Sequence, residues 1–145
     1  MVHGVYVIGT VLDGRVNAMT AAWVARASFV PPLVTVAVGR TRFSHDMILS
    51  SGVFSVNVMG PGDVELARHF GFKTGRKVDK FRDVPYDTAV TGSPILKGCA
   101  AWLDCRLSAS HEAGDHTLVV GEVVDGGVNP AVEQALVYDR KRFFR

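Results

Sequence analysis

Two arginines, a threonine and a serine lie close together in RTRFSHD, residues 40–46. Guanidinium groups and hydroxyls bind phosphate, and the segment stands where a predicted strand gives way to a predicted helix, whose first N–H groups also attract anions. Arg40, Arg42 and Ser44 are therefore candidate ligands of a phosphate. The alternative is an ordinary helix start with solvent-exposed arginines, which is the commoner situation for such a segment alone. Neither GxxxxGK[ST] nor a strand followed by GxGxxG occurs, so a nucleotide would be bound in another way.

The segment NAMTAAWVARASFVPP, residues 17–32, combines small side chains with an amide, hydroxyls and an indole. A flat heteroaromatic ring needs small neighbours on one face, polar groups along one edge and an aromatic wall. The alternative is a core strand that ends in a polar turn, which the segment alone slightly favours. The candidates for a ring site are Asn17, Thr20, Ala21, Ala22, Trp23, Ser28 and Phe29.

Two further polar residues stand where they could reach a ligand. His116 opens a predicted strand after Gly114-Asp115, at what would be a barrel rim, although such a histidine is more often only a turn residue. Lys80 lies in a charged loop and reaches either an anion or only solvent. The run HEAGDH resembles the zinc signature HExxH, but its histidines are five residues apart with a glycine between them. We therefore expect no metal site.

The elements that would position these residues are mostly strands. VHGVYVIGTVL and NAMTAAWV flank the turn pair Asp13-Gly14 and predict a hairpin. Alternating apolar residues favour one strand from Met19 to Phe29, and the continuous apolar run LVTVAVG predicts a strand buried on both faces. CAAWLDCRLSAS and HTLVVGEVVDGGV predict another strand pair.

Helices are expected only in FSHDMILSSG and GPGDVELARHFG, each closed by a glycine. A long polar loop from Phe72 to Pro94 follows the second helix. Because strands predominate and do not alternate with helices, we expect a mainly antiparallel barrel with helical decorations.

Composition is that of one globular domain. Of 145 residues, 48% are hydrophobic and 21% charged, and 16 basic against 14 acidic residues give +2, too little to imply nucleic acid or membrane. The sequence has no run of about 18 uncharged apolar residues and no signal peptide, so a cytoplasmic protein is expected. Cys99 and Cys105 are interpreted as two buried thiols rather than reactive ones.

Five stretches, in this order, resemble the flavin reductase family of FMN-binding split barrels, in particular its flavoredoxin-like branch. They cover nearly the whole chain: NAMTAAWVARASFVPPLVTVAV, RTRFSHDMILSSGVFSVNVM, VELARHFGF with KVDKF, SPILKGCAAWLDCRL and GDHTLVVGEVVDGGV. The resemblance implies a single domain over residues 1–145 with a six-stranded, antiparallel split β-barrel and two or three short helices. It also implies a homodimer with the flavin near the subunit interface, and FMN rather than FAD as the cofactor.

The resemblance also implies roles for individual residues. Those lining the isoalloxazine ring and the ribityl chain would be Asn17, Met19, Thr20 and Trp23, with Ser28 and Phe29 in the next flavin-facing segment. Arg40, Arg42 and Ser44 would form the phosphate-binding turn. Lys80 and His116 would add further flavin contacts, and Phe143 would be a C-terminal aromatic that covers the site. No side chain is a certain acid or base, so His116 has a supporting role only.

The function expected on this basis is an oxidoreductase that moves electrons from NAD(P)H through bound FMN to free flavin, ferric iron or a redox protein. One alternative is an FMN electron carrier that a protein donor reduces. Another is a small barrel that binds single-stranded nucleic acid through Arg40, Arg42 and the basic tail. The small net charge and the lack of interleaved basic and aromatic residues speak against the last alternative.

Overall fold

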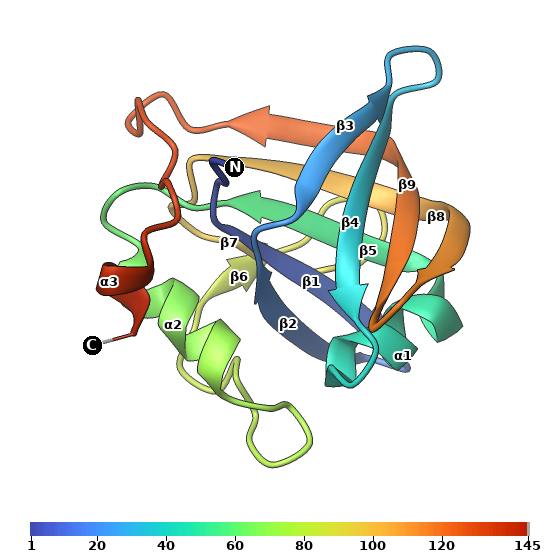
Figure 1. The fold of residues 1–145 in the computed structure, drawn as a ribbon, viewed down its shortest axis with the longest axis horizontal. Helices are drawn as coiled ribbons and strands as arrows, with labels where there is room; N and C mark the ends of the chain where they lie inside the picture. Colours follow the sequence, from blue (N-terminus) through green and yellow to red (C-terminus); the bar gives the residue numbers. More distant parts are fainter. Residues whose placement is uncertain (145) are drawn as a thin grey trace.

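Seven strands form one antiparallel sheet in the computed structural model, which describes residues 1–144 (Figure 1). The order of the strands in the sheet is β2-β1-β5-β8-β9-β4-β3. Their bounds are β1 Tyr6–Leu12, β2 Arg15–Ala21, β3 Val24–Ser28, β4 Leu33–Gly39, β5 Val53–Val58, β8 Ala101–Ala113 and β9 His116–Val128. Two short strands, β6 (Tyr86–Asp87) and β7 (Ile95–Leu96), form a separate pair. The mainly β, antiparallel prediction is confirmed, with 44% strand and 15% helix.

The two strands at the edges of this sheet are neighbours in the chain. Only Ala22 and Trp23 separate β2 from β3, although the two strands lie at opposite ends of the strand order. The backbone carbonyl of Trp23 accepts a hydrogen bond of 3.0 Å from the N–H of Ala37 in β4. The sheet must therefore curl until its edges meet, which produces the split barrel.

The β1–β2 hairpin turns where the sequence predicts it. Asp13 and Gly14 both have positive φ, 51° and 78°, as the two central residues of a tight hairpin turn require. The register pairs Ile8 with Met19 across the hairpin, and both side chains are buried inside the barrel. Because successive side chains point to opposite faces, Ala18 packs on the other side, against the helices.

Two apolar cores follow from this alternation. The barrel interior contains Ile8, Met19, Val34, Val36, Val38, Ile48, Phe54, Val56, Cys105 and Val119. The second core lies between the sheet and the helical side and contains Val5, Val7, Ala18, Met59, Val64, Ala67, Phe70, Phe81, Leu96, Cys99, Leu136 and Phe143. Both cysteines are free and buried, as expected, and burial raises the pKa of Cys99 to about 11 and that of Cys105 to about 12.

Three helices flank the sheet (Figure 1). Helix α1 (Phe43–Ser51) ends before Gly52, and α2 (Val64–Phe72) continues one residue past Gly71, where its end was predicted. A short third helix, α3 (Arg140–Phe143), lies beside α2. Within residues 1–144 none of the helices is long and apolar enough to cross a membrane.

Two strand predictions were wrong in detail. Residues 19–29 are not one strand, because the chain bends at Ala22 and Trp23 to pass from one sheet edge to the other. Trp23 and Phe29 are consequently 53% and 77% exposed rather than part of an apolar face. The run LVTVAVG is fully buried on one face only, at Val34, Val36 and Val38, whereas its other residues are half-buried.

Candidate functional site

Three adjoining hollows follow β2 from Asn17 to Trp23. Their volumes are about 370, 180 and 290 Å³. Met19 lines the first two, Thr20 and Trp23 line the last two, and Arg42 lines all three. The three hollows thus form one groove, which we call the β2 groove, with Arg42 along its length.

One end of the β2 groove is suited to an anion. Helix α1 begins here. The N–H of His45 donates to the carbonyl of Arg42 at 3.1 Å, but among residues 1–144 no side chain caps the N–H groups of Phe43 and Ser44. Ser44 is only 1% exposed, and its Oγ accepts a 2.8 Å hydrogen bond from Nδ2 of Asn17, which is also buried. Within residues 1–144 the Ser44 hydroxyl proton has no acceptor. A phosphate oxygen in this hollow would supply that acceptor.

Lys80 lies buried in the wall of the same hollow. Its Nζ donates to the carbonyls of Ala18, at 2.8 Å, and Phe70, at 2.9 Å, and the side chain is 4% exposed. Burial, and secondly the nearby Arg42 guanidinium, lower the pKa of Lys80 from 10.5 to about 8. A protonated Lys80 has one N–H left for a ligand, and an anion would counter the charge that its surroundings disfavour.

The middle of the groove is a narrow cleft beside an aromatic pair. The rings of Trp23 and His116 are 4.8 Å apart between centroids. The carboxylate of Asp115 lies 2.6 Å from Nδ1 of His116, and this hydrogen bond lowers the pKa of Asp115. Because a carboxylate can only accept, Nδ1 carries the hydrogen. In the tautomer that has its only ring hydrogen on Nδ1, Nε2 is an acceptor.

Aromatic side chains surround the far end. Phe143, predicted to cover the site, is 4% exposed and belongs to the core beneath the groove. The neighbouring Phe144 is exposed instead and packs edge-on against Phe72, with ring centroids 5.3 Å apart. Phe143 therefore anchors the C-terminal segment, and Phe144 with Phe72 forms the exposed aromatic wall. The sequence offered the FF pair but no signal for which ring would be outermost.

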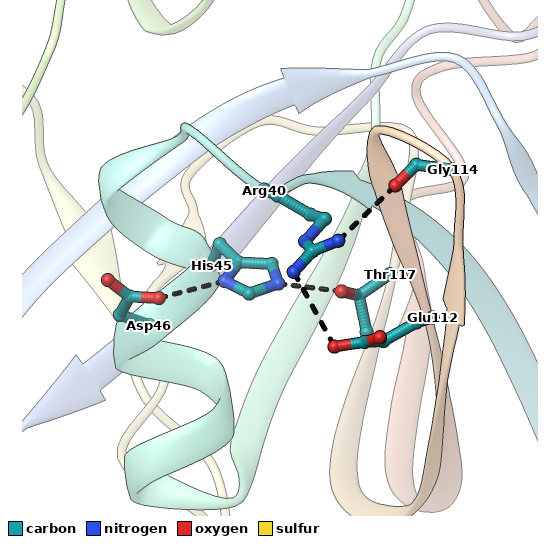
Figure 2. A network of polar contacts seen from close by, with 6 residues as sticks. All are labelled: Arg40, His45, Asp46, Glu112, Gly114 and Thr117. Atoms are coloured by element: carbon teal, nitrogen blue, oxygen red, sulfur yellow. Dashed lines mark hydrogen bonds and ion pairs between the residues drawn. The ribbon is translucent and has the colours of Figure 1, made fainter.

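Arg40 is not brought to the groove. Figure 2 shows its guanidinium directed to the β8–β9 hairpin, where Nη2 lies 3.5 Å from a carboxylate oxygen of Glu112 and Nη1 donates to the carbonyl of Gly114. The sequence placed Arg40 and Arg42 on one phosphate, but the contacts with Glu112 and Gly114 hold the guanidinium of Arg40 at the β8–β9 hairpin. Only Arg42 faces the hollow.

Ser28 and Phe29 also lie apart from the groove. They line a separate hollow of about 340 Å³ on the β3–β4 side, together with Tyr6, Leu33 and Leu103 among others. The bend at Ala22 and Trp23 separates them from the β2 residues with which the sequence grouped them.

A buried contact that sequence reasoning missed joins the anion end of the site to its middle. His45, in the first turn of α1, contacts Thr117 Oγ1 through Nε2 at 2.7 Å and Asp46 through Nδ1 at 2.9 Å (Figure 2). Thr117 is the neighbour of His116 in β9. The helix that begins at the anion end is thereby fixed to the strand that carries the aromatic cleft.

The structure therefore brings together most of the predicted residues and separates a few. Those that line the β2 groove are Asn17, Met19, Thr20, Trp23, Arg42, Ser44, Lys80, His116 and Phe143. The structure also shows that the loop after α2 lines the groove with three basic residues, Lys73, Arg76 and Lys77. The sequence indicated this segment only as a charged loop.

The sequence matches the family described as "Flavin reductase like domain" over residues 1–145, so the chain belongs to this family. It is 36% identical over 140 residues to Diflavin flavoprotein A 1 of Synechocystis sp., and the match covers 95% of this chain. The chain spans about a quarter, 24%, of that protein's length.

Two solved structures of flavin-binding proteins have the same fold as this chain. One is an NADH:FAD oxidoreductase of Streptomyces globisporus, with a TM-score of 0.89 and 30% identity, covering 96% of this chain and 82% of that one. The other is an FMN-binding protein of Thermus thermophilus, also with a TM-score of 0.89, with 33% identity and coverage of 95% and 82%.

Proposed function

We propose that this protein binds FMN in the β2 groove and acts as a flavin reductase. A single observation carries the proposal: an anion site and an aromatic cleft lie at successive points of one groove. At the first point the buried hydroxyl of Ser44 has no acceptor for its proton among residues 1–144, and at the second Trp23 and His116 form a wall. The FMN-binding protein of Thermus thermophilus supports the choice of cofactor.

The residues of the anion end fit a phosphate group in charge and in hydrogen bonding. A phosphate monoester carries close to two negative charges near neutral pH. Arg42 and Lys80 supply opposite charge, and Ser44 and the start of α1 supply donors. Asn17 directs the Ser44 hydroxyl by occupying its acceptor side. The charge of the phosphate would thus be countered on several sides.

The residues of the cleft position a ring and need no acid or base of their own. Trp23 and His116 form one wall, and the small side chains Ala21 and Ala22 leave room for a flat ring beside the backbone. Nε2 of His116 can accept a hydrogen bond, and Asp115 fixes the ring that carries it. Bound flavin would supply the hydride and electron transfer itself.

Reduced nicotinamide is the proposed electron donor, with free flavin, ferric iron or a redox protein as acceptor. The name of the Streptomyces globisporus structure, an NADH:FAD oxidoreductase, supports the donor. To test this, FMN-loaded protein is mixed anaerobically with NADH or NADPH in a stopped-flow spectrometer. Rapid loss of the oxidised flavin bands supports the reductase. Bleaching only after addition of a reduced redox protein would favour the electron-carrier alternative.

We also propose that the protein is a homodimer that associates through the β3–β4 side. Phe29 and Val30 project from this hairpin with 77% and 92% exposure beside the separate hollow lined mainly by apolar residues. Exposed apolar surface of this kind marks an interface. Sedimentation equilibrium should give twice the chain mass, and Phe29→Asp should shift it to the monomer. A monomeric wild type would contradict the proposal.

A further inference from the structure

The hollow at the anion end has a second wall that the proposed FMN phosphate does not need. This wall is the loop 73–77, which follows α2 and faces the start of α1 across the hollow. We call it the basic loop. Its sequence is KTGRK, so three of its five residues are cationic.

The basic loop is fastened in place rather than free in solvent. Gly75 is buried, and a Cβ built on it would lie 2.4 Å from Oδ1 of Asn17, so the loop backbone packs directly on the floor of the hollow. Arg15 donates to the carbonyl of Gly75, and Arg76 donates to the carbonyl of Thr41 at 3.0 Å. Both guanidinium groups also stack on the ring of Phe43, at 4.7 and 5.3 Å from its centroid. The loop is therefore a built wall.

The charge in the hollow exceeds what one phosphate neutralises. Five cationic side chains line it, and within the described part of the chain no aspartate or glutamate does: Arg42, Lys73, Arg76, Lys77 and Lys80. Lys73 and Lys77 have no side-chain partner among residues 1–144. A phosphate monoester brings about two negative charges. Held by Ser44, Arg42 and Lys80, it leaves the cations of the basic loop without a counter-charge.

We propose that the basic loop is a subsite for a second phosphoryl group, so that the hollow accommodates the pyrophosphate of a dinucleotide. The proposal rests on the proposed function, because the first phosphate is that of the flavin. Two molecules carry a pyrophosphate into such a site: FAD in place of FMN, and the reduced nicotinamide dinucleotide that donates the hydride. In FAD, Lys73 and Lys77 would contact the phosphoryl group that Ser44 does not. With FMN bound, they would contact a phosphoryl group of the nicotinamide dinucleotide beside the FMN phosphate.

The test uses the full chain with Lys73→Ala and Lys77→Ala together. The control, Lys97→Ala with Lys141→Ala, removes the same charge outside the hollow. Equilibrium affinities for riboflavin, FMN and FAD are measured by quenching of flavin fluorescence. With the FMN-loaded proteins, the KM for reduced nicotinamide is measured separately. Lys73→Arg with Lys77→Arg should restore the wild-type values, because it retains the charge.

If FAD supplies the second phosphoryl group, the double alanine variant loses about tenfold in FAD affinity and much less in FMN affinity, and riboflavin is unaffected. If the nicotinamide donor supplies the second phosphoryl group, the double alanine variant binds FMN and FAD as tightly as the wild type does, and its KM for the dinucleotide rises by a similar factor. Equal losses for FMN and FAD with an unchanged KM, or losses equal to those of the control variant, would overturn the proposal but not the flavin site. Failure of the wild type to bind any flavin would overturn the proposed function itself.

Discussion

The lowered pKa of Lys80 predicts that binding of the proposed flavin phosphate depends on pH in a defined window. Without ligand, the pKa is about 8, because burial and Arg42 disfavour the ammonium form. An anion beside Lys80 favours that form and returns the pKa toward 10.5, so binding above about pH 8 requires uptake of a proton. Raising the pH from about 7 to about 9.5 should therefore weaken FMN binding.

The size of the effect follows from the fraction of protein that is protonated at Lys80 before binding. With a pKa of about 8, this fraction is roughly nine-tenths at about pH 7 and roughly 3% at about pH 9.5. Affinity for FMN should fall by up to about thirtyfold, or about 2 kcal/mol. Riboflavin has no phosphate, so its affinity should stay nearly constant. The assay is titration of either flavin with protein at a series of pH values, followed by fluorescence.

Two results would refute this reasoning. One is an equal loss of affinity for riboflavin, and the other is the same pH dependence in Lys80→Met, which has no ammonium to titrate. The folded protein alone offers an independent check. Since the pKa of Lys80 is lower in the folded chain than in the unfolded chain, the unfolded chain binds more protons between about pH 8 and 10.5. The free energy of unfolding contributed by Lys80 should rise with pH across that window.

Three other substitutions test separate parts of the site and the fold. Ser44→Ala should weaken FMN by about 1 to 3 kcal/mol and leave riboflavin nearly unchanged in the same titration, and equal losses would mean that the phosphate lies elsewhere. Trp23→Ala removes one wall of the cleft, so it should weaken riboflavin and FMN by similar factors in calorimetric titrations. Asp104→Ala should lower the free energy of unfolding by about 2 kcal/mol or more in urea, because the buried carboxylate accepts hydrogen bonds from the N–H groups of Val90 and Thr91. An unchanged urea midpoint would contradict that role.

Local signals in the sequence predicted most of the long strands and the two longer helices, whereas long-range geometry decided the site. The Asp13-Gly14 turn and the period of alternation predict the first hairpin because a tight turn and a pleat depend on near neighbours alone. The same alternation could not show that the chain bends at Trp23, since that bend exists only because β2 and β3 end at opposite edges of the sheet. Phe29 was therefore grouped with the ring site although it lies beside a different hollow.

The arginines illustrate the same limit for side chains. Arg40 and Arg42 are equivalent as sequence signals, yet Glu112 and Gly114 lie 72 and 74 residues from Arg40 and decide where its guanidinium points. The basic loop was missed for a related reason. As a sequence, KTGRK is typical of a solvated turn. Only the structure shows that the backbone of Gly75 packs against Asn17, 58 residues earlier in the chain.

The position of β2 at the sheet edge explains why the groove forms along it. An edge strand leaves the N–H and C=O groups of alternate residues without a neighbouring strand. At Ala18 the ammonium of Lys80 takes the place of that strand by donating to the carbonyl. The backbone N–H and C=O groups of successive residues point to alternate sides of a strand. Those of Thr20, two residues further along, therefore point to the same side as those of Ala18. Thr20 also lines the cleft beside Trp23, where its backbone N–H and C=O groups would be available to the proposed ring. We propose that this strand edge, which another barrel would have to protect, recognises the polar edge of the flavin.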